Sequence, residues 1–507
     1  MDMIGSEIAI STVIVVIFIL LLAYAVFFHK SSKLEDNSMG EFAVASRKFN
    51  FIVVTCTLIG AFLPGSVYIG WFSWGMEEGL IAQYLAIYGS ACFFMMYIFS
   101  SKIWVWGKQF GLITQPDLFH LRFRSKPLTV GTALAGWFIE VPWTVMELAA
   151  CGWVVNAITG GTIPNWVGIV FFAAFAVLYV NAGGMKAVAT VEVLKGILVI
   201  AIAIFGSVIL MYMNFGGFTN MFKELMEVAP EHMTFNTGGE YPYTYWCSIV
   251  FTGTIGVFAW QSCFARIYTA NSLKEVKKSA SSGAILVAFV AVTLLTLGAA
   301  AFLIPGAADM ENPDLVFFYL FSTAFGPFML GIIGILIIAT SLGMIGVMFN
   351  AHGAAISENI IRVIKPTANE QQRVKYTRIV IVFYGIGAAL FAMMDLPNLA
   401  FIAITFYEGI VQFVPFIVFA IFWKRANKWG VGIGLVVGIF ISVAAGFWPD
   451  AFTWAGGWTG GPIGFVVNIA INIVLGFAIK QEDYVEELFE KASSYKEDSY
   501  GNEIFNA

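Results

Sequence analysis

The chain has 507 residues, of which 59% are hydrophobic and only 12% are charged, and its net charge is −5. Soluble domains carry about 25% charged residues, so this composition excludes a soluble protein. Apolar stretches such as 8–28 and 197–213 run far past the alternating segments of about 10 residues that build a membrane β-barrel. The composition therefore predicts an all-α polytopic membrane protein.

Hydrophobic runs bounded by polar residues, Gly or Pro predict about thirteen transmembrane helices, since one span takes about 20 apolar residues. The first run follows Asp2 and Glu7 rather than basic residues, so it is interpreted as a retained helix and not as a signal peptide. The predicted spans lie near 7–28, 51–79, 82–103, 128–158, 165–182, 188–213, 244–264, 280–304, 326–361, 377–394, 398–423, 429–447 and 461–480.

Basic residues gather on one side of this topology. Alternate connections and the C-terminal tail hold 25 of the 27 Lys and Arg residues, with Lys223 on the other side and Lys195 inside a span. The positive-inside rule then predicts a multi-pass plasma-membrane protein with its N-terminus outside and its C-terminus in the cytoplasm. The tail, residues 481–507, is short, which argues against a transporter-like sensor with a cytoplasmic signalling module.

Helix-weakening residues interrupt two of the predicted spans, at 60–66 in the second span and at 253–256 in the seventh. Helices broken at matching positions in two halves indicate a transporter with inverted repeats, because the freed backbone groups can bind solute or ion at mid-membrane. The alternative is that Gly and Pro are simply frequent in membrane helices.

Several connections resemble motifs of the sodium:solute symporter family. The matching segments are 41–47, 114–126, 183–188 followed by Glu192, and 266–275. The resemblance implies a LeuT-type fold with ten core helices in two inverted halves of five, and a secondary transporter that works by alternating access. It divides the chain into a leading helix and linker at 1–50, repeats at 51–213 and 244–423, an extracellular loop at 214–243, trailing helices at 424–480, and the tail.

The family's shared sodium site combines backbone carbonyls at the first break with two hydroxyls on the eighth core helix. The resemblance places the carbonyls at Gly60 and Leu63, and the hydroxyl positions at Gly343 and Met344. Hard cations bind through oxygen, and neither Gly343 nor Met344 has a side-chain oxygen. We therefore expect a degenerate sodium site and no bound metal or other cofactor.

Lys195 lies inside a predicted span, where a lysine costs about 2.5–3.5 kcal/mol on the insertion scale. It could snorkel to the inner surface, or its ammonium could replace the sodium ion and exchange a proton. Transport would then be sodium-independent or proton-coupled. The expected ion-coupling residues are Gly60, Leu63, Glu192, Lys195, Gly343 and Met344, with Thr340 and Ser341 available if the alignment slips by one turn.

The solute chamber is expected where the broken helices meet the third core helix. Glu140, Trp143 and Glu147 recur there at i, i+3 and i+7 and share one helix face. The carboxylates could instead pair with Lys195 or a backbone donor, and the deep tryptophans could face lipid. The expected solute-binding residues are Gly65, Ser66, Trp71, Glu140, Trp143, Glu147, Trp260, Gln261 and Glu408.

Carboxylates among aromatic rings, with no arginine expected deep in the membrane, favour a cation held by charge and cation–π contact. The predicted solute is an amine, a quaternary ammonium compound or an amino-acid-like molecule. The alternative is an ordinary sodium-coupled symporter of proline-like amino acids or monocarboxylates. Neither a nucleophile–base spacing nor a metal motif occurs, so we predict no enzyme activity and no nucleic-acid partner.

Overall fold

The computed structural model describes residues 5–235, 241–394 and 399–497, and the regular elements within them are helices. The first half contains α1 (Gly5–Phe27), α2 (Met39–Val44), α3 (Phe51–Ile59), α4 (Phe72–Glu78), α5 (Tyr84–Phe110), α6 (Gln115–Phe123), α7 (Lys126–Ile158), α8 (Asn165–Leu198), α9 (Phe205–Phe215) and α10 (Phe218–Val228). The second half contains α11 (Tyr243–Gly256), α12 (Gln261–Tyr268), α13 (Leu273–Ala300), α14 (Val316–Phe325), α15 (Pro327–Ile356), α16 (Arg362–Ile364), α17 (Glu370–Ala392), α18 (Leu399–Ile410), α19 (Phe413–Phe422), α20 (Lys428–Phe447), α21 (Gly460–Ala478) and α22 (Tyr484–Ser493).

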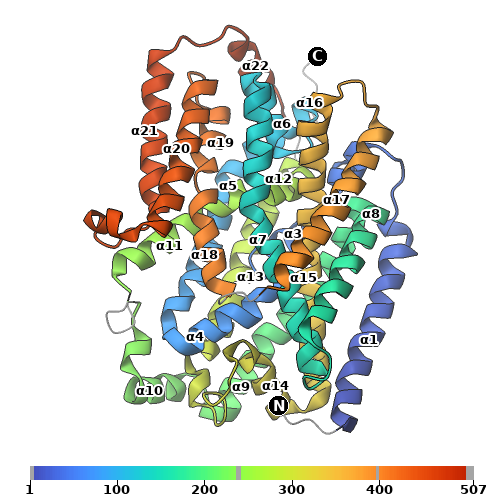
Figure 1. Ribbon diagram of the computed structural model, residues 1–507, viewed down its shortest axis with the longest axis vertical. Helices are drawn as coiled ribbons and strands as arrows, with labels where there is room; N and C mark the ends of the chain where they lie inside the picture. The colour runs from blue at the N-terminus through green and yellow to red at the C-terminus, as the bar shows by residue number, and fades with distance from the viewer. Residues whose placement is uncertain (1–4, 236–240, 395–398, 498–507) are drawn as a thin grey trace.

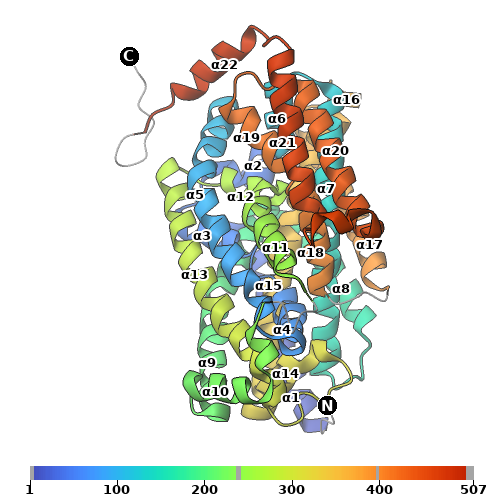
Figure 2. The same ribbon diagram turned by 90° about the vertical axis from the view of Figure 1, so that its left-hand side faces the viewer.

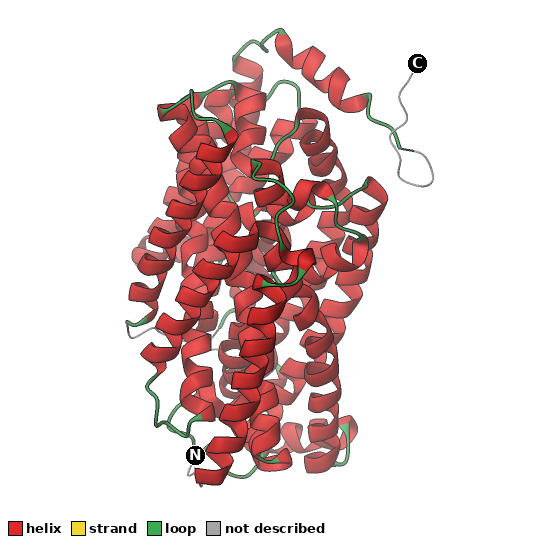
Figure 3. Ribbon diagram, turned by 90° about the vertical axis from the view of Figure 1, so that its right-hand side faces the viewer, coloured by secondary structure: helices red, strands yellow, loops and turns green. Residues whose placement is uncertain are grey.

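The long helices run along the long axis of the molecule and are joined by short loops (Figure 3). Helix α1 lies at one edge beside α8, and α20 and α21 pack together at the opposite edge (Figure 1). Helix α1 begins at the end that carries α10 and α14, whereas α22 lies at the other end, called here the α22 end. Outward-facing apolar residues such as Leu20 and Leu21 are 65% and 64% exposed, as expected for a lipid-facing surface.

Ten helical stretches among the described residues are long and apolar enough to cross a membrane, or eleven if the bent pair 243–259 and 261–268 forms one span. The multi-pass prediction is confirmed, but the count of about thirteen is not. Two of the ten stretches, Val67–Phe110 and Asn165–Phe215, contain 44 and 51 residues and each covers more than one predicted span. In the second of these, Gly184 breaks helical geometry with φ 51° and ψ −140°, between the predicted spans.

The first broken helix comprises α3, a non-helical turn over residues 60–64, a helical segment that starts at Gly65 and continues through the π-helical turn η3 (Val67–Trp71), and α4. The second comprises α11, a 3-10 turn η8 (Val257–Ala259) and α12, which are bent by 49°. Its break falls at Trp260, whose ψ of 141° is extended, rather than at the predicted 253–256. Gly253 instead allows close packing, because a Cβ there would lie 2.6 Å from the Tyr88 ring.

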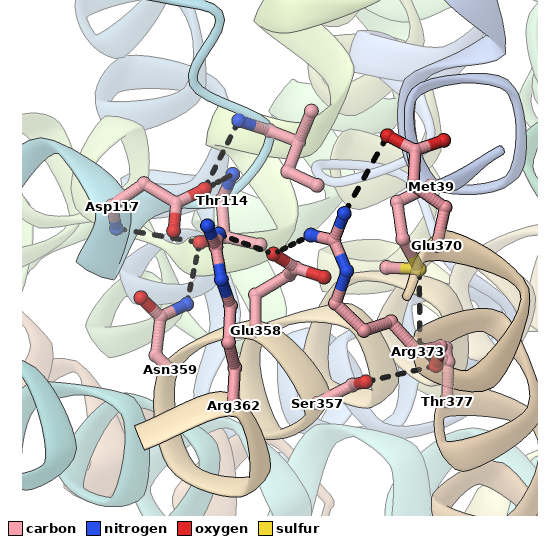
Figure 4. Close-up of polar contacts among 11 residues, drawn as sticks. Met39, Thr114, Asp117, Ser357, Glu358, Asn359, Arg362, Glu370, Arg373 and Thr377 are labelled. Atoms are coloured by element: carbon pink, nitrogen blue, oxygen red, sulfur yellow. Dashed lines mark hydrogen bonds and ion pairs between the residues drawn. The ribbon is translucent and has the colours of Figure 1, made fainter. Parts of the chain in front are cut away.

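A polar cluster joins three helices at the α22 end (Figure 4). The Asn359 amide donates to the Thr114 hydroxyl at 2.7 Å, which ties the end of the α15 stretch to the first residues of α6. Glu358 forms ion pairs with Arg362 at 3.1 Å and with Arg373 of α17 at 2.6 Å. Through Thr114, the 114–126 motif therefore fixes the start of α6 against the end of the α15 stretch, which is far away in the sequence.

Candidate functional site

The break in the first helix is held by Glu147 of α7. Its carboxylate is fully buried and accepts hydrogen bonds from the Gly65 N–H at 2.8 Å and from the Ser66 hydroxyl at 2.5 Å. The Ser66 N–H adds longer bonds of 3.4 Å. A carboxylate in this position satisfies N–H groups at the start of a helical segment and interacts favourably with its dipole.

The break in the second helix is held in the same way by Glu140, two helical turns earlier on α7. Glu140 accepts from the Gln261 N–H at 2.5 Å and from the Ser262 N–H at 3.3 Å, at the start of α12. Its other neighbour is the buried His352, whose Nε2 lies 3.3 Å from Glu140 Oε2. One face of α7 thus supplies a carboxylate to each broken helix, and both glutamates meet backbone donors.

Four large aromatic side chains lie between the two breaks, Trp71, Trp143, Trp260 and Tyr407, called here the aromatic cluster. The Trp143 ring centroid lies 5.9 Å from Trp71, 5.0 Å from Trp260 and 5.3 Å from Tyr407. Trp143 and Trp260 are each only 1% exposed, so they face the interior rather than lipid. Tyr407 was not among the expected solute-binding residues, although it is adjacent to Glu408.

Two predicted chamber residues have structural partners. The Gln261 side-chain amide donates to the Thr132 carbonyl at 3.1 Å and so ties α12 to α7. Glu408 accepts from the Thr459 hydroxyl at 2.8 Å and from the Gly461 N–H, at the start of α21. These carboxylate contacts are with a trailing helix, whereas the adjacent Tyr407 joins the aromatic cluster.

The predicted ion-coupling lysine forms a buried ion pair. Lys195 Nζ lies 2.5 Å from Glu192 Oε2, one helical turn away on α8, and the two side chains are 1% and 0% exposed. Arg266 of α12 lies on the other side of the carboxylate, with Nη2 3.6 Å from Glu192 Oε1. Lys195 therefore does not snorkel to the surface. The three residues are called here the charged cluster.

The charged cluster fills the space between the first broken helix and α15. A Cβ on Gly60 would contact Lys195 Nζ and would lie 2.7 Å from Glu192 Oε1. A Cβ on Gly343 would lie 2.9 Å from the Glu192 carboxyl carbon. The two glycines that resemblance assigned to the sodium site thus flank the ion pair directly, and their lack of side chains makes room for it.

The remaining predicted ion-site residues are all fully buried. The Thr340 hydroxyl donates within its own helix, to the Leu336 and Ile337 carbonyls at 2.8 and 2.9 Å. Ser341 lies against the first break, since a Cβ on Gly65 would contact its Oγ. The Met344 sulfur accepts from Arg266 at 3.2 Å, and Leu63 belongs to the surrounding core.

Sequence reasoning missed Arg266, which was expected in an inner connection. Arg266 is 0% exposed and its guanidinium reaches Glu192. Helix α12 has only eight residues and begins inside the molecule, so a residue near its end still reaches the charged cluster. The sequence marked Arg266 only as the first residue of the matched segment 266–275. Nothing in the sequence linked Arg266 to Glu192.

The model of the sodium:solute symporter family matches residues 42–438. The chain belongs to this family. Its family and fold are those of transporters and not of enzymes.

Relatives of this symporter include the uncharacterized symporters YhjB and YodF of Bacillus subtilis (strain 168). YhjB is 24% identical over 411 residues, covering 81% of this chain and 84% of YhjB. YodF is 28% identical over 435 residues, covering 85% and 86%. A monocarboxylic acid transporter of Corynebacterium glutamicum is 24% identical over 362 residues, covering 65% and 64%.

Solved structures share the fold. A Na+-coupled sialic acid symporter in a substrate-bound outward-open state superposes with a TM-score of 0.76 at 16% identity, covering 93% of this chain and 98% of that one. Mhp1, a nucleobase-cation-symport-1 family transporter, gives 0.60 at 12% identity, covering 92% and 100%. The LeuT-type fold implied by the motifs is confirmed.

Proposed function

We propose that this symporter moves a small organic solute by alternating access with the charged cluster in place of the usual sodium ion. The observation that carries the proposal is the position of the Glu192–Lys195 pair, flanked by Gly60 and Gly343. Charged side chains are costly to bury, so they are usually paired or functional. An ion pair at the expected sodium position supports a role in coupling solute transport to an ion gradient.

The charges support the substitution. With all three groups ionised, Lys195 and Arg266 contribute two positive charges and Glu192 one negative charge, which leaves the +1 of a sodium ion. Sodium would need oxygen ligands, and residues 343 and 344 offer no side-chain oxygen. The tethered charge therefore performs the electrostatic role of the ion without binding one.

A lysine can also exchange its proton during a transport cycle, whereas an arginine remains charged. Of the two cations in the charged cluster, Lys195 is the one whose charge can be removed and restored as the broken helices move. We infer that a proton gradient, or the solute gradient alone, drives transport, and that sodium does not.

The predicted solute class is supported by the groups that surround the two breaks. Glu147 and Glu140 already occupy the backbone N–H groups that could hold a solute carboxylate. The aromatic cluster beside them suits a cation, whose contact with a desolvated ring contributes about 2 kcal/mol. Within the described residues the indole N–H groups of Trp143 and Trp260 have no hydrogen-bond partner, so they suit a solute that also carries an acceptor.

We therefore favour an amine, a quaternary ammonium compound or an amino-acid-like zwitterion. The second candidate is sodium-coupled uptake of a monocarboxylate or proline-like amino acid. It is favoured by the name of the Corynebacterium relative. The two candidates differ in both the charge of the solute and the need for sodium.

We also propose that the α22 end faces the cytoplasm and that the N-terminus lies outside, in the plasma membrane. The arrangement of α1 and α22 at opposite ends supports an N-terminus and a tail on different sides (Figure 1). The concentration of basic residues on the side of the tail supports the assignment of that side to the cytoplasm.

The test is uptake into proteoliposomes from a pool of labelled amines, zwitterions and monocarboxylates, with sodium and proton gradients imposed separately. We expect accumulation of a cationic or zwitterionic solute that is unchanged when potassium replaces sodium. Accumulation of a monocarboxylate that requires sodium would establish the second candidate instead. Liposomes without protein correct for leakage of each solute.

A further inference from the structure

An open groove of about 970 Å³ lies at the α22 end, where α13 and α5 meet the C-terminal tail. Four lysines line it, Lys274, Lys277 and Lys278 on the first turns of α13 and Lys496 in the tail. Among the described residues that line the groove, Glu497 is the one acidic side chain. The groove is therefore strongly basic.

The carboxylate of Glu497 is engaged at one end of the groove. It accepts from the Leu273 N–H at 3.0 Å, which is the start of α13, and from the Tyr495 hydroxyl at 2.6 Å. Lys278 pairs with Glu275 at 3.8 Å while its side chain remains 49% exposed. Lys277 is also exposed, so the ammonium groups of Lys277 and Lys278 can approach a ligand in the groove.

The opposite end of the groove opens onto the outer surface of α5 and α13, which lie side by side (Figure 2). Tyr97 and Ile285, which line the groove, are 44% and 60% exposed. The same surface of α13 continues with Phe289 and Val292, which are 61% and 47% exposed. In a membrane protein such a stripe faces acyl chains, so the lysines lie where a lipid headgroup would be.

We infer that this groove binds an anionic phospholipid, with its phosphate among the lysines of α13 and its acyl chains along Tyr97 and Ile285. Basic pockets next to membrane helices recognise anionic headgroups through charge, and the adjoining apolar stripe selects a lipid over a soluble anion. The inference concerns a site separate from the aromatic and charged clusters and does not depend on the solute or the coupling ion.

The ligand would touch two parts of the transporter. Phe51, the first residue of the first broken helix, lines the groove, and its N–H donates to Glu275 of α13 at 2.6 Å. Tyr495 of the tail also lines the groove and packs edge-on against Trp104, with ring centroids 5.6 Å apart. A bound lipid would therefore bridge the tail and the base of α3.

Native mass spectrometry of the full chain in detergent tests the site with three probes: phosphatidylglycerol, phosphatidylcholine and soluble glycerol phosphate. We expect at least tenfold stronger binding of phosphatidylglycerol than of phosphatidylcholine, and no retention of glycerol phosphate. The variant Lys274→Gln/Lys277→Gln/Lys278→Gln should lose this preference.

A matched control removes the same charge elsewhere at the α22 end, by Lys30→Gln/Lys33→Gln/Lys375→Gln, where all three lysines are exposed. This control should keep the preference. If the wild type and the α13 variant prefer phosphatidylglycerol equally, the proposed site is wrong. If the α13 variant and the control lose the preference equally, overall charge and not this groove explains the binding. If glycerol phosphate binds as strongly as the lipid, the ligand of the groove is a soluble anion and not a lipid. Should the triple variant not fold, Lys277→Gln/Lys278→Gln gives the same comparison.

Discussion

Removing the ammonium of Lys195 is the most informative perturbation of the charged cluster. The Lys195→Ala variant leaves the buried Glu192 carboxylate with Arg266 at 3.6 Å and changes the cluster from +1 to neutral. Removing one partner of a buried ion pair typically costs 3–5 kcal/mol, because the other charge stays in a low-dielectric site. We expect a strongly lowered melting temperature and at least a tenfold loss of transport.

A second variant separates the fixed charge of the cluster from proton exchange by Lys195. Glu192→Gln/Lys195→Met removes both partners and leaves Arg266, so the cluster keeps its +1 charge but has no lysine proton to exchange. Because Arg266 then keeps its buried charge without a carboxylate partner, we expect a lowered melting temperature together with lost transport. Lys33→Ala, at an exposed lysine, serves as the control.

The assay is initial uptake into proteoliposomes with sodium or potassium outside, measured beside thermal melting in detergent. Wild-type uptake should be equal in the two salts within about twofold. Steep sodium activation of the wild type, or full uptake by Lys195→Ala, would refute the coupling role of the charged cluster. Normal uptake by the double variant would show that fixed charge suffices and that proton exchange by lysine is not used.

Three further predictions address the breaks, the glycines and the topology. Glu147→Gln retains a carbonyl for the Gly65 N–H but removes the negative charge. The affinity for a cationic solute, measured by calorimetry, should therefore weaken at least tenfold, while the melting temperature changes little. An unchanged affinity would show that the solute binds elsewhere. Gly343→Ala should destabilise the fold by about 1–3 kcal/mol through overpacking, because the new Cβ would lie 2.9 Å from the Glu192 carboxyl carbon. Gly387→Ala should not destabilise it, because nothing lies within 4 Å of that Cβ. Equal melting temperatures of the two variants would contradict the packing argument. Cysteines at Ser494 and Thr234 should react from the inside and the outside of cells respectively, and labelling from the same side would contradict the topology.

The fold could be predicted because its signals are local. Hydrophobic runs, helix-weakening residues and short motifs each lie within one stretch of chain, and the family resemblance carried by the motifs implies the LeuT-type fold. Span counting was less reliable for the same reason. The predicted spans on either side of Gly184 belong to one helical stretch, which is interrupted there only by a non-helical backbone angle. The second helix break lies at Trp260, where no glycine signals it.

The charged cluster was predictable only in part. Glu192 and Lys195 are three residues apart on a helix, so their pairing follows from spacing. Their approach to Gly60 and Gly343 could be expected only through a resemblance that fixed how α3, α8 and α15 pack. Arg266 and His352 carry no such signal, since a buried partner far away in the sequence leaves no periodic trace.

The two glutamates of α7 connect the broken helices to the choice of solute. Each accepts N–H groups at the start of a helical segment, and the seven-residue spacing of Glu140 and Glu147 places both carboxylates on one face of a single helix. A solute carboxylate at either break would have to displace a protein carboxylate that is already bonded and buried. A solute ammonium would instead gain from both negative charges and from the aromatic rings between them. On the proposed function, the contacts that stabilise the breaks would therefore bias the chamber toward cations, and the charge of the solute would follow from how the broken helices are held.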